Sequence, residues 1–275
     1  MKAPSPAVAV ERRFVQTRSG RIHLAIAGQG LPVLLLHQTP RSWDEYRDVL
    51  PLLGRGWQAI AMDTVGFGDS QPLPAHENTI ERWAAAAFDL LDALGIERAA
   101  VAGHHTGAVV ALEMAAARPD RVPALVLSSC PLVDAARRAG HHGKPVIDEV
   151  AHRASGEHVL ELWRRRQPFY PEGDVDLLER FIVDALKAGA LAAEGHHVVN
   201  RYAMETRIGR VRCPTLVIGA TDDPHAFPAA PRVAAAIAGS RLQEIQGGRV
   251  PLPDQLPEAF AQAVSAFLSE IAPKS

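Results

Sequence analysis

A histidine set between glycines, His105, is the residue of this chain best suited to do chemistry. It lies at the centre of Gly103-His104-His105-Thr106-Gly107, after the apolar run 99–102 and before the alanine-rich stretch 108–117. An apolar run, a glycine-lined turn and a helical stretch predict a sharp strand-to-helix turn that exposes its central side chain. A neutral imidazole there can take a proton from water or from a substrate near pH 7. It can also act as a nucleophile, although the chain lacks a glycine-rich loop that would cradle a phosphate.

Two acids and one arginine are the candidate partners of His105. Asp222 and Asp223 follow the apolar run 215–218, and Arg249 follows two glycines. Either carboxylate can orient an imidazole and stabilise its protonated form. A guanidinium can hold a carboxylate or a developing oxyanion with two parallel N–H groups. The predicted catalytic set is therefore His105, Arg249 and one of the two aspartates, with the choice between them open.

A metal site is an alternative interpretation of the histidines. The chain has 12 of them, with adjacent pairs at 104–105, 141–142 and 196–197. Imidazoles together with Asp222 or Asp223 can form a zinc or iron site. Adjacent pairs do not have the i, i+4 spacing that places two ligands on one face of a helix. We therefore assign no metal ligand and expect no cofactor, while a structural role for His105 in an inactive pocket also stays open.

Composition excludes several classes of partner. The net charge of −2 gives no electrostatic basis for binding nucleic acid or an anionic membrane surface. No apolar run approaches the roughly 18 residues of a membrane span. Residues 1–6 lack the apolar core of a signal peptide, and the two cysteines, Cys130 and Cys213, lie far apart. We expect a cytoplasmic protein that binds a small-molecule substrate, and a homodimer stays open as its assembly.

Apolar and amphipathic runs alternate along most of the chain, which indicates a largely parallel sheet covered by helices. An antiparallel hairpin is expected to turn near Ser19-Gly20. Between residues 132 and 208 the alternation stops, and the charged, aromatic-rich sequence predicts several helices. The expected domains are a core formed by 1–131 and 209–275 and a helical cap formed by 132–208. A helix is expected over Ser42–Leu53, and examples of the amphipathic helices expected in the cap are Val146–Ala154, His158–Arg166 and Leu177–Leu186.

Four segments, in this order, resemble those of the α/β-hydrolase superfamily, with the architecture of epoxide hydrolases and dehalogenases. Residues 34–40 (LLLHQTP) are similar to the H-G-x-P oxyanion segment, and 63–70 (DTVGFGDS) to the D-x-x-G-x-G-x-S loop. Residues 103–107 resemble the nucleophile elbow, and 216–224 the strand end that carries the catalytic acid. The resemblance implies an α/β fold with a mostly parallel eight-stranded sheet, flanking helices and an inserted helical cap.

The chain departs from this family at two catalytic positions. The elbow carries His105 instead of Ser, Cys or Asp, and the place of the usual histidine falls on Arg249 or Val250. The serine relay needs a hydroxyl and an imidazole to receive its proton, so we expect no acyl-enzyme on serine. By resemblance, the backbone N–H groups of Thr39 and Thr106 form the oxyanion hole.

Other residues are expected near the substrate, with bracing of loops or packing as the alternative for each. These candidate substrate-binding residues are His37, Gln38, His104, His196, His197, Trp163 and Tyr202. The predicted function is acid–base hydrolysis or lyase-type cleavage of a small, partly apolar carbonyl compound. The alternatives are a noncatalytic ligand-binding protein with a degenerate triad and a metal-dependent enzyme that uses the histidines.

Overall fold

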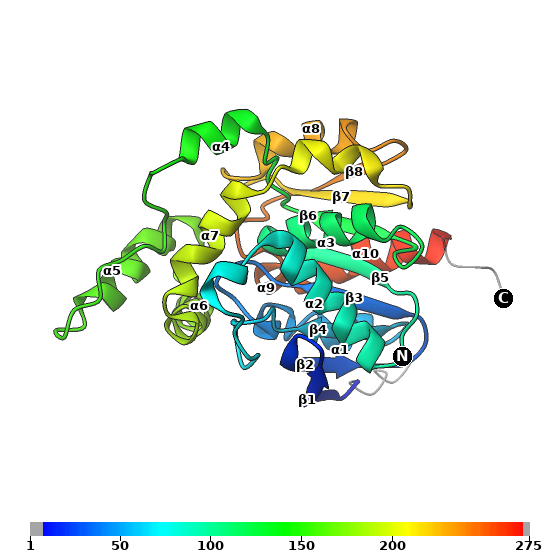
Figure 1. The fold of residues 1–275 in the computed structure, drawn as a ribbon, viewed down its shortest axis with the longest axis horizontal. Coiled ribbons are helices and arrows are strands. Elements are labelled where there is room, and N and C mark those ends of the chain that lie inside the picture. Colours follow the sequence, from blue (N-terminus) through cyan, green and yellow to red (C-terminus); the bar gives the residue numbers. More distant parts are fainter. Residues whose placement is uncertain (1–7, 272–275) are drawn as a thin grey trace.

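The computed structural model describes residues 8–271 and is built around one β-sheet (Figure 1). The strands within this range are β1 (Val10–Thr17), β2 (Gly20–Ala27), β3 (Pro32–Leu36), β4 (Gln58–Met62), β5 (Ala100–His104), β6 (Leu125–Ser128), β7 (Thr215–Ala220) and β8 (Arg241–Ile245). They form an eight-stranded sheet in the order β1-β2-β4-β3-β5-β6-β7-β8. β2 pairs antiparallel with β1 and β4, and the remaining pairs are parallel. The predicted fold class is confirmed.

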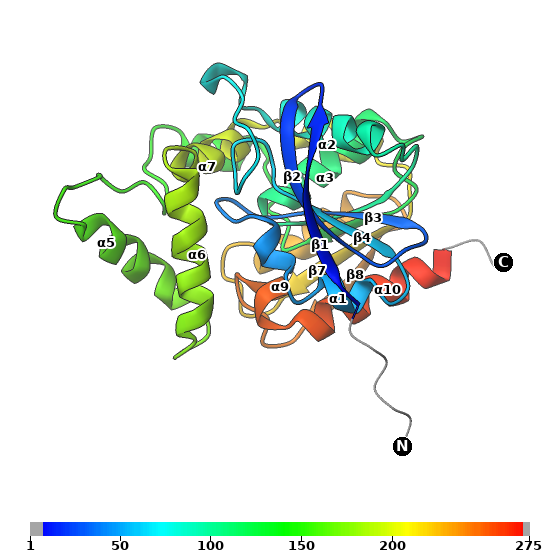
Figure 2. The same ribbon diagram turned by 90° about the horizontal axis from the view of Figure 1, so that it is seen from below.

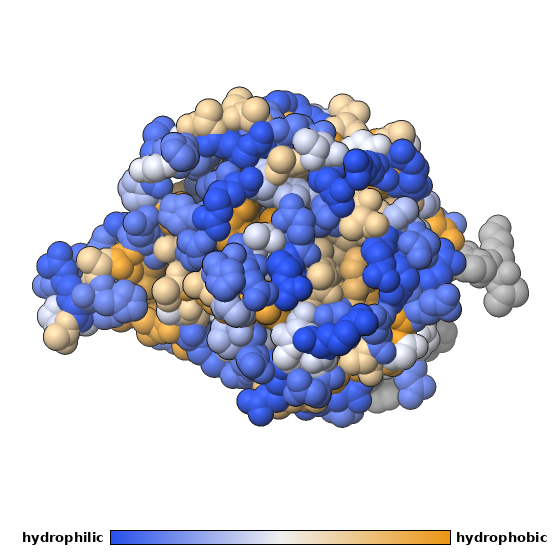
Figure 3. Space-filling view, in the orientation of Figure 1, coloured by the Kyte–Doolittle hydropathy of each residue, from blue (hydrophilic) through white to orange (hydrophobic). Residues whose placement is uncertain are grey.

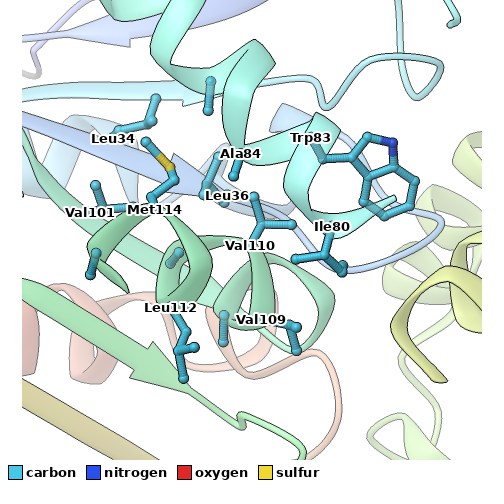
Figure 4. Close-up of a cluster of buried hydrophobic side chains, with 14 of the residues drawn as sticks. Leu34, Leu36, Ile80, Trp83, Ala84, Val101, Val109, Val110, Leu112 and Met114 are labelled. Atoms are coloured by element: carbon cyan, nitrogen blue, oxygen red, sulfur yellow. The ribbon is translucent and has the colours of Figure 1, made fainter. Parts of the chain in front are cut away.

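The central strands are buried on both faces, which explains their nearly continuous apolar sequences. In β3, Leu34 and Leu36 belong to one core cluster, whereas Val33 and Leu35 belong to the other. Alternate residues of a strand point to opposite faces, so this division follows from the two-residue period. Figure 4 shows Leu34 and Leu36 packed with side chains of the helices on the first face.

Helices cover both faces of the sheet. The first face carries α2 (Ile80–Ala93), α3 (Thr106–Ala117) and α8 (Ala230–Ala235), and the second carries α1 (Leu50–Leu53), α9 (Leu252–Gln255) and α10 (Pro257–Ile271). Short 3-10 helices are η1 (Trp43–Tyr46), η2 (Ala75–Glu77), η3 (Gln167–Phe169), η4 (Met204–Thr206), η5 (Ile208–Arg210) and η6 (Phe227–Ala229).

The chain between β6 and β7 forms a group of helices that projects from one side of the sheet (Figures 1 and 2). They are α4 (Ala135–His141), α5 (Glu157–Arg166), α6 (Val175–Ala188) and α7 (Leu191–Arg201). α5 and α6 share a small core that includes Leu162, Tyr170 and Phe181. The face of the molecule shown in Figure 3 is mainly hydrophilic, and some hydrophobic residues are exposed on the projecting group of helices. We keep 132–208 as the proposed extent of the cap.

Two expected elements differ from the structure. The helix predicted over Ser42–Leu53 is divided into η1 and α1, because Pro51 has no N–H to continue a helix that enters from η1. No helix forms over Val146–Ala154, where Asp148 instead uses its carboxylate to bind Arg166. His196 and His197 both lie on α7.

Residues 1–6, on which the expectation about a signal peptide rests, lie outside the described residues. None of the helices in the part of the chain that the structure describes is long and apolar enough to cross a membrane. Cys130 and Cys213 are free thiols.

Candidate active site

The turn between β5 and α3 places His105 at the carboxyl edge of the sheet. Its backbone has φ 47° and ψ −111°, a conformation that costs a non-glycine residue about 1–3 kcal/mol. Hydrogen bonds hold the turn: the His105 N–H donates to Ser128 O at 3.0 Å, and the Ala108 N–H to His105 O at 3.0 Å. A Cβ at Gly103 or Gly107 would meet backbone atoms at 2.1 and 1.9 Å, so both glycines are required by close backbone contacts.

His105 lies against one of the two candidate acids. Its Nε2 is 2.8 Å from Oδ2 of Asp223, a carboxylate with no solvent exposure. The other oxygen of Asp223 accepts the backbone N–H groups of His225 at 2.9 Å and Ala226 at 3.2 Å. Burial opposes ionisation of Asp223, but the imidazole and these N–H groups together hold its pKa well below the usual value. The pair is therefore a carboxylate facing an imidazole at the elbow.

The contact between His105 and Asp223 is close but is not a well-directed hydrogen bond. The His105 and Asp223 atoms are within ion-pair distance, yet neither has a well-directed hydrogen bond to any described residue. The side chain of His105 is 15% exposed while its Nε2 is buried, so other atoms of the ring face the open space. Such contacts in a ligand-free site often become aligned only when the substrate is bound.

The structure does not bring the other two predicted catalytic residues to the elbow. Asp222 is exposed and accepts a hydrogen bond from Thr221 Oγ1 at 3.2 Å. Arg249 reaches the carbonyl of Tyr170 at 3.4 Å, and its backbone N–H donates to Gln255 at 2.7 Å. These bonds turn the arginine toward the inserted helices and leave its neighbour, Val250, facing His105 across the cavity.

His104 is a buried brace. Its Nε2 lies 2.8 Å from the carbonyl of Val250 and its Nδ1 lies 2.9 Å from the hydroxyl of Ser128. Because a carbonyl can only accept, Nε2 carries the proton and Nδ1 accepts from the serine. Burial, with a further contribution from His105, lowers the pKa of His104 to about 3. His104 therefore stays neutral and ties the elbow to the loop after β8.

We expect His104 to make the fold less stable as the pH falls below about 6.5. The unfolded histidine binds a proton near the ordinary pKa of 6.5 and the folded one only near 3, so its stabilisation is complete above 6.5 and is lost toward 3. The slope from this residue is up to about 1.4 kcal/mol per pH unit. Urea unfolding between about pH 7 and about pH 5 measures it. The His104→Gln variant should have a shallower slope, and equal slopes would contradict the assignment.

A cavity of about 270 Å³ opens in front of His105. It is lined from the sheet side by Gln38, Thr39, Thr106 and Val250, and from the inserted helices by His196 among others. The backbone N–H groups of Thr39 and Thr106 make no hydrogen bond to another described residue. They are therefore free to donate to an oxygen in the cavity, as an oxyanion hole requires.

Gln38 and His37 are used within the protein. The backbone N–H of Gln38 donates to Glu45 Oε2 at 2.8 Å and its side-chain amide to Oε1 at 2.6 Å. The Nδ1 of His37 lies 2.8 Å from the carbonyl of Gln38, and its Nε2 accepts the N–H of Thr64 at 2.9 Å. Gln38 thus forms part of the wall with its amide nitrogen bound to Glu45, and His37 braces two loops outside the cavity.

The predicted residues of the inserted helices separate into two groups. His196 lines the cavity, whereas His197 borders another depression and lies 3.6 Å from Glu149. Successive residues of a helix point about 100° apart, so adjacent histidines of α7 cannot face the same site. Trp163 packs against the core of α5 and α6, and the hydroxyl of Tyr202 donates to Glu113 at 2.6 Å. Neither of these aromatic residues reaches the cavity.

Two arginines at the cavity were not identified from the sequence. Arg166 is buried, donates to Asp148 through Nε at 2.7 Å and through Nη2, and Asp148 also lies 2.7 Å from His196. Burial opposes it, but Arg166 and His196 lower the pKa of Asp148 to about 2. Arg137 lines the same cavity from α4. The i, i+4 relation of Leu162 and Arg166 is the only sequence signal that places this arginine on a buried face.

The residues described here do not assemble a metal site at the elbow. Within 8–271, one group has three possible ligand atoms within 4.8 Å of one another, and it comprises His23, Asp63 and Asp69. His23 Nδ1 lies 2.8 Å from Asp63, and Asp69 binds Lys187 at 2.6 Å, so these side chains already have partners. The histidines at 141–142 and 196–197 add no such group around His105.

Comparisons with known proteins agree with this architecture. Residues 32–143 match the family model for the α/β hydrolase fold. Epoxide hydrolase 2 of Siraitia grosvenorii is 38% identical over 119 residues, which cover 42% of this chain and 38% of that protein. Haloalkane dehalogenase 2 of Mycobacterium bovis is 32% identical over 119 residues, or 43% of this chain and 42% of that protein. Each match therefore spans less than half of the relative.

The similarity in structure extends over nearly the whole chain. The crystal structure of a hydrolase from Pseudomonas aeruginosa PA01 aligns with a TM-score of 0.79 and 25% identity, covering 94% of this chain and 98% of the other. The chain has the α/β-hydrolase fold, with its eight-stranded sheet, the elbow between β5 and α3 and helices inserted between β6 and β7.

Proposed function

We propose that this protein is an enzyme in which His105 acts as a general base oriented by Asp223. The observation that carries the proposal is the 2.8 Å approach of His105 Nε2 to Asp223 Oδ2 at the elbow. The reaction is hydrolysis or lyase-type cleavage of a small, partly apolar carbonyl compound. The similar proteins include an epoxide hydrolase and a haloalkane dehalogenase, which supports the assignment as an enzyme. The histidine at the elbow, in place of Ser, Cys or Asp, is the reason for proposing base catalysis.

The proton follows a short path in this mechanism. With the proton on Nε2, the ring nitrogen that lies 2.8 Å from Asp223, the Nδ1 of His105 has a free lone pair. That lone pair accepts a proton from a water molecule or from an acidic group of the substrate. The resulting imidazolium is stabilised by the carboxylate of Asp223, which remains ionised because its pKa is held low. No covalent intermediate is needed.

Negative charge that develops on the substrate carbonyl requires donors already in place. The free backbone N–H groups of Thr39 and Thr106, both at the cavity, supply them in this mechanism. Val250, at the position of the usual histidine, contributes an apolar wall instead of a base. A serine relay has neither its hydroxyl nor its imidazole here, which favours direct base catalysis.

Turnover of any substrate found by screening carbonyl compounds should resist two inhibitors. A fluorophosphonate should leave the rate unchanged because no serine lies at the elbow, and a chelator should leave it unchanged because the base needs no metal. A serine enzyme would lose activity with the fluorophosphonate, and a metal enzyme would lose activity with the chelator. Stoichiometric labelling of one serine with loss of activity, or silencing by chelation, would refute the mechanism. Ligand binding without any turnover would instead support a noncatalytic binding protein.

A further inference from the structure

The wall of the cavity that faces His105 carries positive charge without negative charge. Arg137 and Arg166 both line it, and no aspartate or glutamate among residues 8–271 does so. The carboxylates that lie nearby, Asp148 and Asp223, are buried behind the side chains they bind. A ligand in the cavity therefore contacts guanidinium and imidazole groups without meeting a carboxylate.

The two arginines differ in how their charges are balanced. The guanidinium of Arg166 is bound by Asp148 through two of its nitrogens, one of which also lies 3.2 Å from His196. This arginine holds Asp148 and His196 in position. It needs no charged ligand, because its own counter-ion is built into the protein.

Arg137 has no such counter-ion. Its Nε donates to the amide oxygen of Asn200 at 3.2 Å, and no described carboxylate lies within ion-pair distance of the guanidinium. The nearest acid along the helix, Asp134, caps α4 through the Arg137 backbone N–H at 2.8 Å and binds Arg232 at 2.9 Å. Burial lowers the pKa of Arg137, as expected for a half-buried cation without a paired anion.

We propose that Arg137 binds a carboxylate group of the substrate, so that the enzyme acts on small carboxylic acids. The proposal deepens the assignment of His105 as a base and rests on it. The two terminal nitrogens of Arg137 have no partner among the described residues and can hold both oxygens of a carboxylate. The same cavity is also lined by the apolar side chains of Val146, Ile147 and Val199, which suit the apolar part of such an acid. At about 270 Å³ the cavity is just below the usual range of about 300–1,000 Å³, which favours a short acid.

Binding of simple carboxylates, measured by calorimetry, tests the site separately from catalysis. The probes are benzoate and hexanoate, each compared with its neutral amide, benzamide and hexanamide. We expect the acids to bind more tightly than the amides, and Arg137→Met to weaken the acids by about 10–100-fold, because a hydrogen-bonded charge pair is lost. Arg137→Lys keeps the positive charge but not the two parallel N–H donors, and it should weaken acid binding less than Arg137→Met does.

Two further variants make the outcomes distinct. Arg164→Met removes an exposed arginine of α5 that does not line the cavity, and it should bind the acids as the wild type does. His105→Ala should keep acid binding while it loses turnover. If His105→Ala retains turnover, the general-base mechanism fails and the acid site stands. If no acid binds, if the amides bind equally well, or if a folded Arg137→Met binds the acids unchanged, the acid site is overturned.

Discussion

Replacing His105 by alanine is expected to lower kcat by about 10²–10⁴-fold and to leave substrate affinity nearly unchanged. The physical reason is that a general base acts on the transition state, whereas the cavity walls that bind the ground state remain. Steady-state kinetics, together with a thermal melt to show that the variant is folded, measure the effect.

Asp223→Asn should produce a loss of similar size. The amide keeps an acceptor for the N–H groups of His225 and Ala226 but no longer stabilises the imidazolium of His105. Asp222→Asn is the matched control, because this neighbouring acid is exposed and lies away from the elbow. The double variant of His105 and Asp223 should be little worse than either single one, since the two residues act as a unit. A fully active His105→Ala enzyme would contradict the assignment of His105 as the general base.

Replacing Arg41 by methionine is expected to destabilise the protein by about 3–5 kcal/mol. Arg41 has no solvent exposure and binds Asp184 at 2.9 Å, Asp44 at 3.2 Å and Asp254 through Nη1. Removing the cation leaves buried carboxylates without their main partner, which costs far more than the pair itself contributes. Because Asp184 belongs to α6, the same change loosens the inserted helices from the sheet.

Urea unfolding measures this loss, and a neighbouring arginine supplies the control. Arg47 is exposed and also pairs with Asp44, so Arg47→Met should cost no more than about 1 kcal/mol. Proteolysis should cut the variant Arg41→Met faster within 132–208 than the control. Equal stability of the two variants would show that the buried carboxylates are neutral without Arg41.

Local pattern was sufficient for most of the fold. Glycines at 103 and 107 with apolar residues before and alanines after them predicted the turn at His105. The pattern failed where side chains serve distant partners. Val146–Ala154 has an amphipathic sequence, but Asp148 gains more from binding Arg166 and His196 than a short helix would provide. Helices of such length are marginal without tertiary support.

A single residue of the inserted helices also has a role that depends on a residue distant in the sequence. Gly195 lies in the middle of α7, and a Cβ there would meet Thr39 at 2.5 Å. The glycine allows α7 to approach the sheet closely, and this brings His196 to the cavity. The need for that contact is invisible in the sequence, because Thr39 lies far away along the chain.

The sequence by itself indicated the alternation of strands and helices in the core and the sharp turn under His105, since each depends on residues adjacent in the chain. Only the tertiary structure decided which charged residues meet at the cavity. Asp223 faces His105 and Asp222 faces solvent because neighbouring residues at a strand end point in different directions. Arg249 turns away and Arg137 lines the cavity because packing between distant helices and loops sets the direction of each side chain.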